Sequence, residues 1–381
     1  MNPYTALQIN HAPRNRRNSE GTFVTLKNGR ILFVWSKFNS DNDSDWGRAV
    51  LASRHSDDEG RTWSDKDEVV VSNGDATNVM SPSLLRLKDG RIALLYLRKD
   101  GRTSCVPWVR FSTNECRSFS KPVRVIHAPG YYVVNNDRMI QLRSGRLIAP
   151  VALHRYRGPH TLKPLKRIPG DKHSIYPKGL DPVFSMPGLI FFYFSDDGGQ
   201  TWLESRMSYY HCTPSGDGLQ EPGVVELKDG RLWSYARNGP LGPTGLEGYA
   251  DRQWESFSKD QGQEWSDPKP SKFISPCSPM HVKRIPKTGH LLAVWNDHSK
   301  HFKVPKPKPI SWVRTPLVSA ISKDDGKTWR HHLLLESAPD YSFCYPAIHL
   351  TSDAALISYN FGSGLTRSER MLRIPFKQLY A

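Results

Sequence analysis

An eight-residue pattern, Ser-x-Asp-x-Gly-x-Thr-Trp, recurs along the chain and restricts the possible folds more than any other feature. It is complete at Ser56–Trp63, Ser195–Trp202 and Ser322–Trp329, carries Glu in place of Thr at Ser258–Trp265, and is degraded at Ser112–Phe119. In such a turn the Asp side chain bonds backbone N–H groups, and the Gly takes a positive φ. Five copies at similar spacing predict a repeat architecture built from strands and tight turns.

A second set of turns alternates with the first. Asn-Gly or Asp-Gly between apolar runs is the strongest short signal for a β-hairpin. Such turns, some of them looser copies, occur at Leu26–Arg30, Leu87–Arg91, Leu142–Arg146, Leu227–Arg231, Pro286–Gly289 and Thr351–Ala354. Two hairpins per unit give a four-stranded antiparallel blade, so six units predict an all-β, six-bladed β-propeller.

We expect a single domain over residues 1–381, because no segment with a helical period is long enough to form a second one. The sixth unit lacks the Ser-x-Asp turn. Its outer strand is expected to come either from Tyr4–Ile9 or from Met371–Ile374, which would close the ring.

The charge of the chain points to anionic partners. The formal net charge is +16 and the pI is about 9.6, which favours acidic glycans, nucleic acid or an anionic surface. No nucleic-acid-binding motif accompanies the basic patches, so we expect no nucleic-acid partner. The five cysteines have no metal-ligand spacing, and no metal or cofactor is expected.

The N-terminal residues lack the apolar core of a signal peptide, and no run is long enough to cross a membrane. A cytoplasmic protein without a membrane partner is therefore expected. A signal peptide removed earlier would leave the same N-terminus, in which case the protein is secreted or periplasmic. The oligomeric state is not indicated.

Strand alternation places both kinds of turn on one face of the propeller. The opposite face then carries the starts of the inner strands and the longer loops, which are Ser36–Gly47, Tyr156–Pro187, Asn238–Arg252 and Asp297–Ser311. The inner strands are expected to start at Ser19–Gly21, Asn78–Pro82, Asn135–Arg138, Gln220–Pro222, Ser275–Pro279 and Cys344–Pro346. Polar groups at all six starts predict a central pocket, although a polar, wet channel without chemistry has the same pattern.

The Ser-x-Asp turns are Asp boxes, and with the order of the blades they resemble the sialidases over nearly the whole chain. The segment from Glu221 to Arg237 resembles the sialidase stretch that carries a catalytic Glu and the second Arg of a carboxylate clamp. Arg314, shortly before the last Asp box, resembles the third Arg. Tyr345 resembles the nucleophilic Tyr, with Tyr341 as a nearby competitor for that role.

The resemblance implies an acid in the first long loop, where Asp41, Asp43 and Asp45 all lie. Asp45 is favoured because it is closest to the following strand. The family's first Arg is missing from its usual motif. Arg16, Arg17 or Arg138 is expected to substitute for it, or else the clamp is incomplete.

Glu20 occupies an additional position on the axis, where it would bind a sugar hydroxyl or act as a second acid or base. The resemblance implies an exo-acting, retaining hydrolase that cleaves a terminal acidic sugar such as sialic acid from a glycan or sialoglycoconjugate, without a cofactor. A neutral Tyr nucleophile suits a substrate whose carboxylate lies beside the reacting carbon.

Two other classes of function remain open at this stage. A polysaccharide lyase or another glycosidase acting on uronic-acid chains would use the basic loops and His154, His160 and His173. A propeller that binds glycans or proteins without catalysis is the second alternative.

Overall fold

A computed structural model describes residues 3–101, 103–155, 187–207, 218–239, 252–364 and 366–381. The regular secondary structure of these residues is almost entirely β-strand; the short helices are η2 (Pro309–Ser311) and α1 (Phe376–Leu379). Within them, no helix has the length and apolar character needed to cross a membrane.

Three four-stranded antiparallel sheets each come from one continuous stretch of chain. The first sheet contains β2 (Arg17–Thr25), β3 (Ile31–Phe38), β4 (Ala49–Ser56) and β5 (Glu68–Val71). The second contains β15 (Leu219–Glu226), β16 (Leu232–Asn238), β17 (Arg252–Ser258) and β18 (Lys269–Ile274). The third contains β19 (His281–Arg284), β20 (Leu291–Asn296), β21 (Leu317–Ser322) and β22 (Arg330–Glu336).

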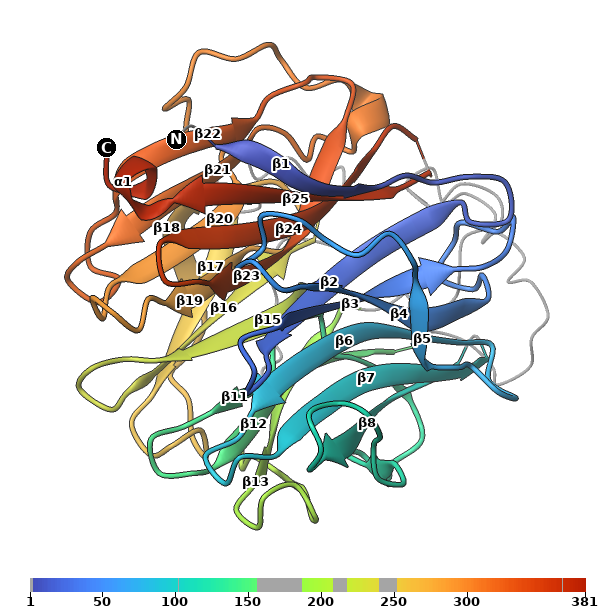
Figure 1. Ribbon diagram of the computed structural model, residues 1–381. Helices are drawn as coiled ribbons and strands as arrows, with labels where there is room; N and C mark the ends of the chain where they lie inside the picture. The colour runs from blue at the N-terminus through green and yellow to red at the C-terminus, as the bar shows by residue number, and fades with distance from the viewer. Residues whose placement is uncertain (1–2, 102, 156–186, 208–217, 240–251, 365) are drawn as a thin grey trace, which may run out of the picture.

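A fourth four-stranded sheet joins the two ends of the chain. It contains β23 (Ser342–Leu350), β24 (Ala354–Gly362), β25 (Ser368–Pro375) and, at its edge, β1 (Tyr4–Ile9). In Figure 1 the blue β1 lies along the red β25, and the two strands pair antiparallel from Tyr4 opposite Arg373 to Ile9 opposite Glu369. Of the two expected sources of the outer strand, Tyr4–Ile9 is therefore the one that lies at this edge.

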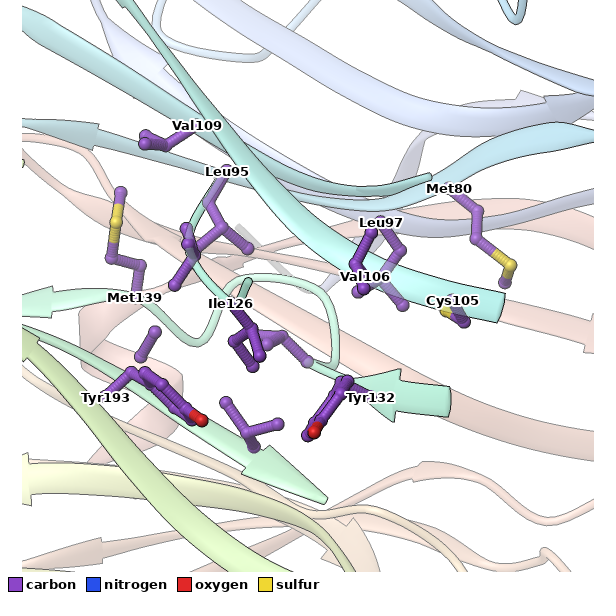
Figure 2. Close-up of a cluster of buried hydrophobic side chains, with 14 of the residues drawn as sticks. Met80, Leu95, Leu97, Cys105, Val106, Val109, Ile126, Tyr132, Met139 and Tyr193 are labelled. Carbon is purple, nitrogen blue, oxygen red and sulfur yellow. The ribbon is translucent and has the colours of Figure 1, made fainter. Parts of the chain in front are cut away.

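The remaining strands form a nine-stranded sheet. They are β6 (Asn78–Arg86), β7 (Ile92–Gly101), β8 (Ser104–Ser112), β9 (Val123–Arg124), β10 (Tyr131–Val133), β11 (Ile140–Gln141), β12 (Leu147–His154), β13 (Leu189–Ser195) and β14 (Leu203–Glu204). A parallel bridge between Tyr131 and Cys105 joins its two halves. Figure 2 shows the apolar side chains packed between these halves, among them Leu95, Ile126 and Met139.

The turns have the arrangement that the sequence predicts. The Gly turn at Leu26–Arg30 joins β2 to β3, and the turn at Ser56–Trp63 joins β4 to β5. In the latter, Asp58 Oδ1 accepts hydrogen bonds from the N–H groups of Arg61 (3.0 Å) and Thr62 (2.9 Å). Asp197, Asp260 and Asp324 likewise accept the N–H of the residue four positions later.

The first strands of neighbouring units pack against one another around a common centre. β2 packs against β6 on one side and against β23 on the other, while β19 lies between β15 and β23. Asp137 donates its N–H to the Pro82 carbonyl at 3.1 Å, which brings the segment before β11 to the same centre. Residues far apart in the sequence meet here.

Candidate functional site

Four of the inner strands break register at equivalent points near this centre. The irregularities lie between Ser19 and Thr22, Met80 and Ser83, Gln220 and Gly223, and Cys344 and Ala347. The first extra residue of each has a positive φ: 63° at Glu20, 53° at Ser81, 48° at Glu221 and 58° at Tyr345. A bulge of this kind turns a side chain away from its normal direction, and such non-glycine conformations cluster at functional sites.

The bulge residues contact each other in two pairs. Tyr345 donates its hydroxyl to Glu221 Oε1 at 3.1 Å. Ser81 donates its hydroxyl to Glu20 Oε2 at 2.6 Å. The first pair joins residues 124 positions apart, on the strands β23 and β15.

Glu221 lies between the tyrosine and an arginine. Arg237 Nε is 3.1 Å from Glu221 Oε2, and the Arg237 side chain is 11% exposed. Arg237 also donates from Nη2 to Gln220 Oε1 at 2.6 Å. Gln220 is a partner that the sequence analysis did not single out, although it directly precedes Glu221.

Arg314 approaches the tyrosine from the loop between β20 and β21. Its Cζ lies 5.8 Å from the centre of the Tyr345 ring. It donates from Nε to the Cys277 carbonyl at 3.1 Å, and its Nη1 is 3.5 Å from Cys344 Sγ. These contacts hold the guanidinium beside the Tyr345–Glu221 pair.

Arg17 holds two carboxylates on the other side of the centre. Its Nη1 is 2.6 Å from Asp45 Oδ1 and its Nη2 is 2.9 Å from Glu20 Oε1. Its Nε donates to Ser19 Oγ at 3.0 Å. The structure therefore brings together Arg17, Glu20 and Asp45 through one guanidinium.

Lys99 is a further residue of this region that the sequence analysis missed. It is 2% exposed, and its Nζ donates to the Asp45 carbonyl at 3.2 Å. The ammonium lies over the rings of Trp46 and Tyr131, 5.2 and 5.3 Å from their centres. Its position in β7, shortly after the apolar run Ile92–Leu97, was the available signal, since a buried charge requires a partner.

The Asp45 main chain is fixed by a second donor. Asn78 Nδ2 donates to the carbonyls of Asp45 (2.8 Å) and Gly47 (3.0 Å). Asp41 instead accepts the N–H of Arg14 at 2.8 Å in an exposed part of the loop. Of the three loop aspartates, Asp45 is the one that contacts Arg17.

Arg138 is more completely buried than Arg17 and Arg367. It is 1% exposed and bonds His281 Nδ1, the Tyr235 hydroxyl and the Met280 carbonyl. His281 Nε2 in turn is 3.0 Å from Asp137 Oδ2. Arg138 thus belongs to a buried network with His281 and Asp137, and Arg17 is the arginine that contacts Asp45.

Two other candidates lie apart from the Tyr345–Glu221 pair. Tyr341 is 42% exposed and its ring packs near Phe343 and Phe361. His154 is 4% exposed, and burial lowers its pKa to about 3, so it is neutral near pH 7. His160, His173 and most of the loops Tyr156–Pro187 and Asn238–Arg252 lie outside the described residues.

The direction of the pKa shift differs among the titratable groups of the pocket. Burial and then the Glu221 charge raise the pKa of Tyr345 well above its usual value, while Arg237 and Arg314 oppose this shift. Burial alone would raise the pKa of Asp45, but the charges of Lys99 and Arg17 outweigh it and hold the pKa far below the usual range. Burial raises the pKa of Glu20 despite Arg17 and Ser81.

The arrangement therefore combines a protonated phenol next to a carboxylate with a cluster of cations. The cations outnumber the carboxylates in this region. The cations are Arg17, Lys99, Arg237, Arg314 and Arg367, and the carboxylates are Glu20, Asp45 and Glu221. A surplus of guanidinium groups suits an anionic ligand, and planar forks suit a carboxylate. No group of three or more His, Cys, Asp or Glu in the described ranges could hold a metal ion.

Residues 66–357, more than half of the sequence, match the model of the BNR repeat-like domain. The chain belongs to the BNR repeat-like family. A comparison with curated protein sequences gives no match. The two kinds of turn and the sheets that they connect are the structural counterpart of this repeat.

Several solved structures resemble this BNR propeller at low sequence identity. A protein of unknown function from Dyadobacter fermentans is 19% identical, with a TM-score of 0.67 over 98% of this chain and 99% of that one. A Hadza microbial sialidase is 16% identical, with a TM-score of 0.66 over 97% of this chain and 68% of that one.

The Trypanosoma rangeli sialidase, solved as a covalent intermediate with 2,3-difluorosialic acid, is 15% identical. Its TM-score is 0.68 over 97% of this chain, which spans 56% of the length of that sialidase. At these identities the likeness shows a sialidase-like fold, and the activity must be argued from the residues of the site.

Proposed function

We propose that this BNR propeller is a sialidase-type glycoside hydrolase that removes a terminal acidic sugar, such as sialic acid, from a glycan in an exo-acting, retaining reaction. The observation that carries this proposal is the 3.1 Å hydrogen bond from the Tyr345 hydroxyl to Glu221 Oε1. A phenol bonded to a carboxylate, with Arg237 and Arg314 beside it, is a nucleophile with its base.

Tyr345 is the nucleophile in this proposal. Its raised pKa means that the phenol keeps its proton until it attacks, so a base must take that proton during the step. Glu221 accepts it as the Tyr345 oxygen bonds to the anomeric carbon. Asp45 donates a proton to the departing glycosidic oxygen.

In the second step water attacks the anomeric carbon and releases the tyrosine. Asp45 accepts a proton from the water, and Glu221 returns its proton to the phenol oxygen. Two displacements at the same carbon give retention of configuration.

Arg17, Arg237 and Arg314 form the proposed clamp for the sugar carboxylate. Arg17 takes the place of the missing first arginine, because it reaches the pocket carboxylates while Arg138 is engaged with His281 and the Met280 carbonyl. Lysine at any of these positions would keep the charge but lose the planar fork.

The architecture proposed for this function is a single domain of six blades over residues 1–381. The nine-stranded sheet then counts as two blades, since its halves meet through the bridge between Tyr131 and Cys105. The cytoplasmic location and the absence of a nucleic-acid partner are still predictions from the sequence alone.

Hydrolysis of a fluorogenic sialoside by the purified protein tests this function. Tyr345→Phe and Glu221→Gln are each expected to lower kcat about 100-fold or more, since each removes a group that acts in the transition state. Tyr341→Phe is the matched control, because it removes a hydroxyl from an exposed ring and should leave kcat unchanged.

A Tyr345→Phe enzyme as active as the wild type would contradict the assignment of the nucleophile. If the wild type releases an unsaturated uronate from an acidic polysaccharide and no sugar from the sialoside, the protein is a lyase. If it binds acidic glycans and releases neither product, it is a binding propeller.

A further inference from the structure

One guanidinium on the floor of the pocket is shared by two carboxylates with different access to solvent. Arg17 contacts Asp45 at 2.6 Å and Glu20 at 2.9 Å. The exposed fraction of the side chain is 11% for Arg17, 3% for Glu20 and 39% for Asp45. Asp45 is therefore the partner on the open side of Arg17, and Glu20 is the partner on the closed side.

The two carboxylates also differ in how firmly they are held. Glu20 accepts the Ser81 hydroxyl through its second oxygen at 2.6 Å. Within the described residues, the side chain of Asp45 has a hydrogen bond through Oδ1 alone, to Arg17. An incoming carboxylate that binds Arg17 from the open side would displace Asp45 before it displaced Glu20.

The surroundings of Asp45 keep it ionised before a ligand arrives. The titratable and charged groups that face it come from β2, β7, β8, β12 and β16; they are Arg17, Glu20, Lys99, Cys105, His154 and Arg237. Lys99 and Arg17 lower the pKa of Asp45 most among them. An ionised Asp45 has no proton to donate, whereas the proposed reaction requires an acid at this position.

We propose that binding of an acidic sugar makes Asp45 take up a proton, because the sugar carboxylate competes with Asp45 for Arg17. This inference rests on the proposed function. The ligand removes the nearest cation from Asp45 and places a like charge beside it, and both changes favour the protonated form. The ligand itself thereby prepares the acid that its cleavage needs.

Each proton that Asp45 takes up during one catalytic cycle is also released. Solvent supplies one proton to Asp45 on binding, and Asp45 gives it to the glycosidic oxygen as the bond to the anomeric carbon breaks. Asp45 then takes a proton from the attacking water. Release of the acidic product restores the Arg17–Asp45 contact, and the proton returns to solvent.

Titration calorimetry with the unsaturated sialic acid analogue DANA, which the Trypanosoma rangeli sialidase binds, tests the inference. The binding heat is measured in two buffers of different ionisation enthalpy at several pH values. We expect uptake of about one proton per ligand in mildly acidic solution, falling as the pH rises above the pKa of Asp45 in the complex.

Variants identify the group that takes up the proton. Asp45→Asn should bind DANA without proton uptake, and Glu20→Gln should retain the uptake, since both variants keep the shape of the side chain. A carboxyl-reduced analogue, which does not compete for Arg17, should bind the wild type more weakly and without uptake. Thermal unfolding of each variant verifies that it is folded.

The outcomes separate this inference from the proposed function. Binding of DANA by the wild type without proton uptake at any pH would overturn the inference and leave the clamp intact. Uptake that persists in Asp45→Asn and disappears in Glu20→Gln would also overturn it. Failure of the wild type to bind DANA at all would count against the proposed function.

Discussion

At the scale of single residues, Glu369 on β25 is a buried acid that lies opposite Asn360 of β24 and near Ser358. It is 1% exposed, and within the described residues neither of its oxygens has a hydrogen bond of ordinary length. Burial raises the pKa of Glu369 well above its usual value, and the Ser358 hydroxyl opposes this only in part. The side chain therefore stays protonated in the folded protein where it ionises in the unfolded chain.

We expect Glu369→Gln to become more stable than the wild type as the pH rises. Above the unfolded pKa of about 4.3, the unfolded wild type releases a proton that the folded protein keeps. This costs the wild type up to about 1.4 kcal/mol of stability per pH unit until the folded pKa is reached. Below the unfolded pKa the cost disappears, since both states are protonated.

Urea unfolding of both proteins at pH 5 and pH 8 measures this difference. Glu68→Gln, a change at an exposed strand position, is the control and should follow the wild type at both pH values. If the difference between Glu369→Gln and the wild type is the same at the two pH values, Glu369 does not have a raised pKa.

At the scale of elements, the Ser-x-Asp turns and the inner-strand bulges have different tasks. The turns close hairpins at one end of the sheets, while the bulges near the opposite end aim Glu20, Ser81, Glu221 and Tyr345 toward each other. Left-handed backbone at such residues costs on the order of 1–3 kcal/mol each. Gly21 directly follows one bulge residue, and a Cβ there would lie 2.3 Å from the Phe33 ring.

Asp58→Ala should therefore reduce stability without reducing specific activity. Asp58 accepts bonds from two backbone N–H groups and from the hydroxyls of Ser56 and Thr62, and their loss should cost about 1–3 kcal/mol. Asp57→Ala is the neighbouring control, since Asp57 is exposed and pairs, among the residues that the structure describes, with the side chains of Arg30 and His55 alone. This change should cost much less.

Thermal unfolding and a sialoside assay of the folded fraction provide the two measurements. An Asp58→Ala protein with wild-type stability and lost activity would contradict the assignment of separate tasks to the two ends of the sheets.

At the scale of the whole molecule, β1 links the N-terminal segment to the last sheet. Leu7 and Ile9 are 8% and 5% exposed and belong to the core shared with Phe33, Leu356 and Met371. This pairing also covers the edge of β25, which would otherwise present unpaired backbone groups. The stability of the last sheet thus depends on segments near both ends of the sequence.

We expect Ile9→Ala to lower the free energy of unfolding by about 2–4 kcal/mol through loss of buried contacts. Thr5→Ala, at an exposed position of the same strand, should change it far less. Urea denaturation compares the two variants with the wild type. Equal stability of all three proteins would mean that β1 does not stabilise the last sheet.

Interactions within a few residues were predictable from the sequence. An Asp side chain reaches the N–H group four positions later, and an Asp-Gly turn needs only its own residues, so both kinds of turn were predicted correctly. Two of the expected inner-strand starts, Asn135–Arg138 and Ser275–Pro279, instead precede the strands β11 and β19. The bulge segments at Glu20, Glu221 and Tyr345 were also recognisable as inner-strand starts. The apolar runs after them indicated which strands would pack at the centre.

Only the tertiary structure decided which of these residues meet. The contact of Tyr345, and not Tyr341, with Glu221 spans 124 positions, and the proposed choice of Arg17 over Arg138 depends on the partners that each guanidinium contacts. The buried Lys99 and the charge on Asp45 follow from burial and from cations on other strands. Such quantities depend on distances between different sheets, and sequence spacing carries no information about them.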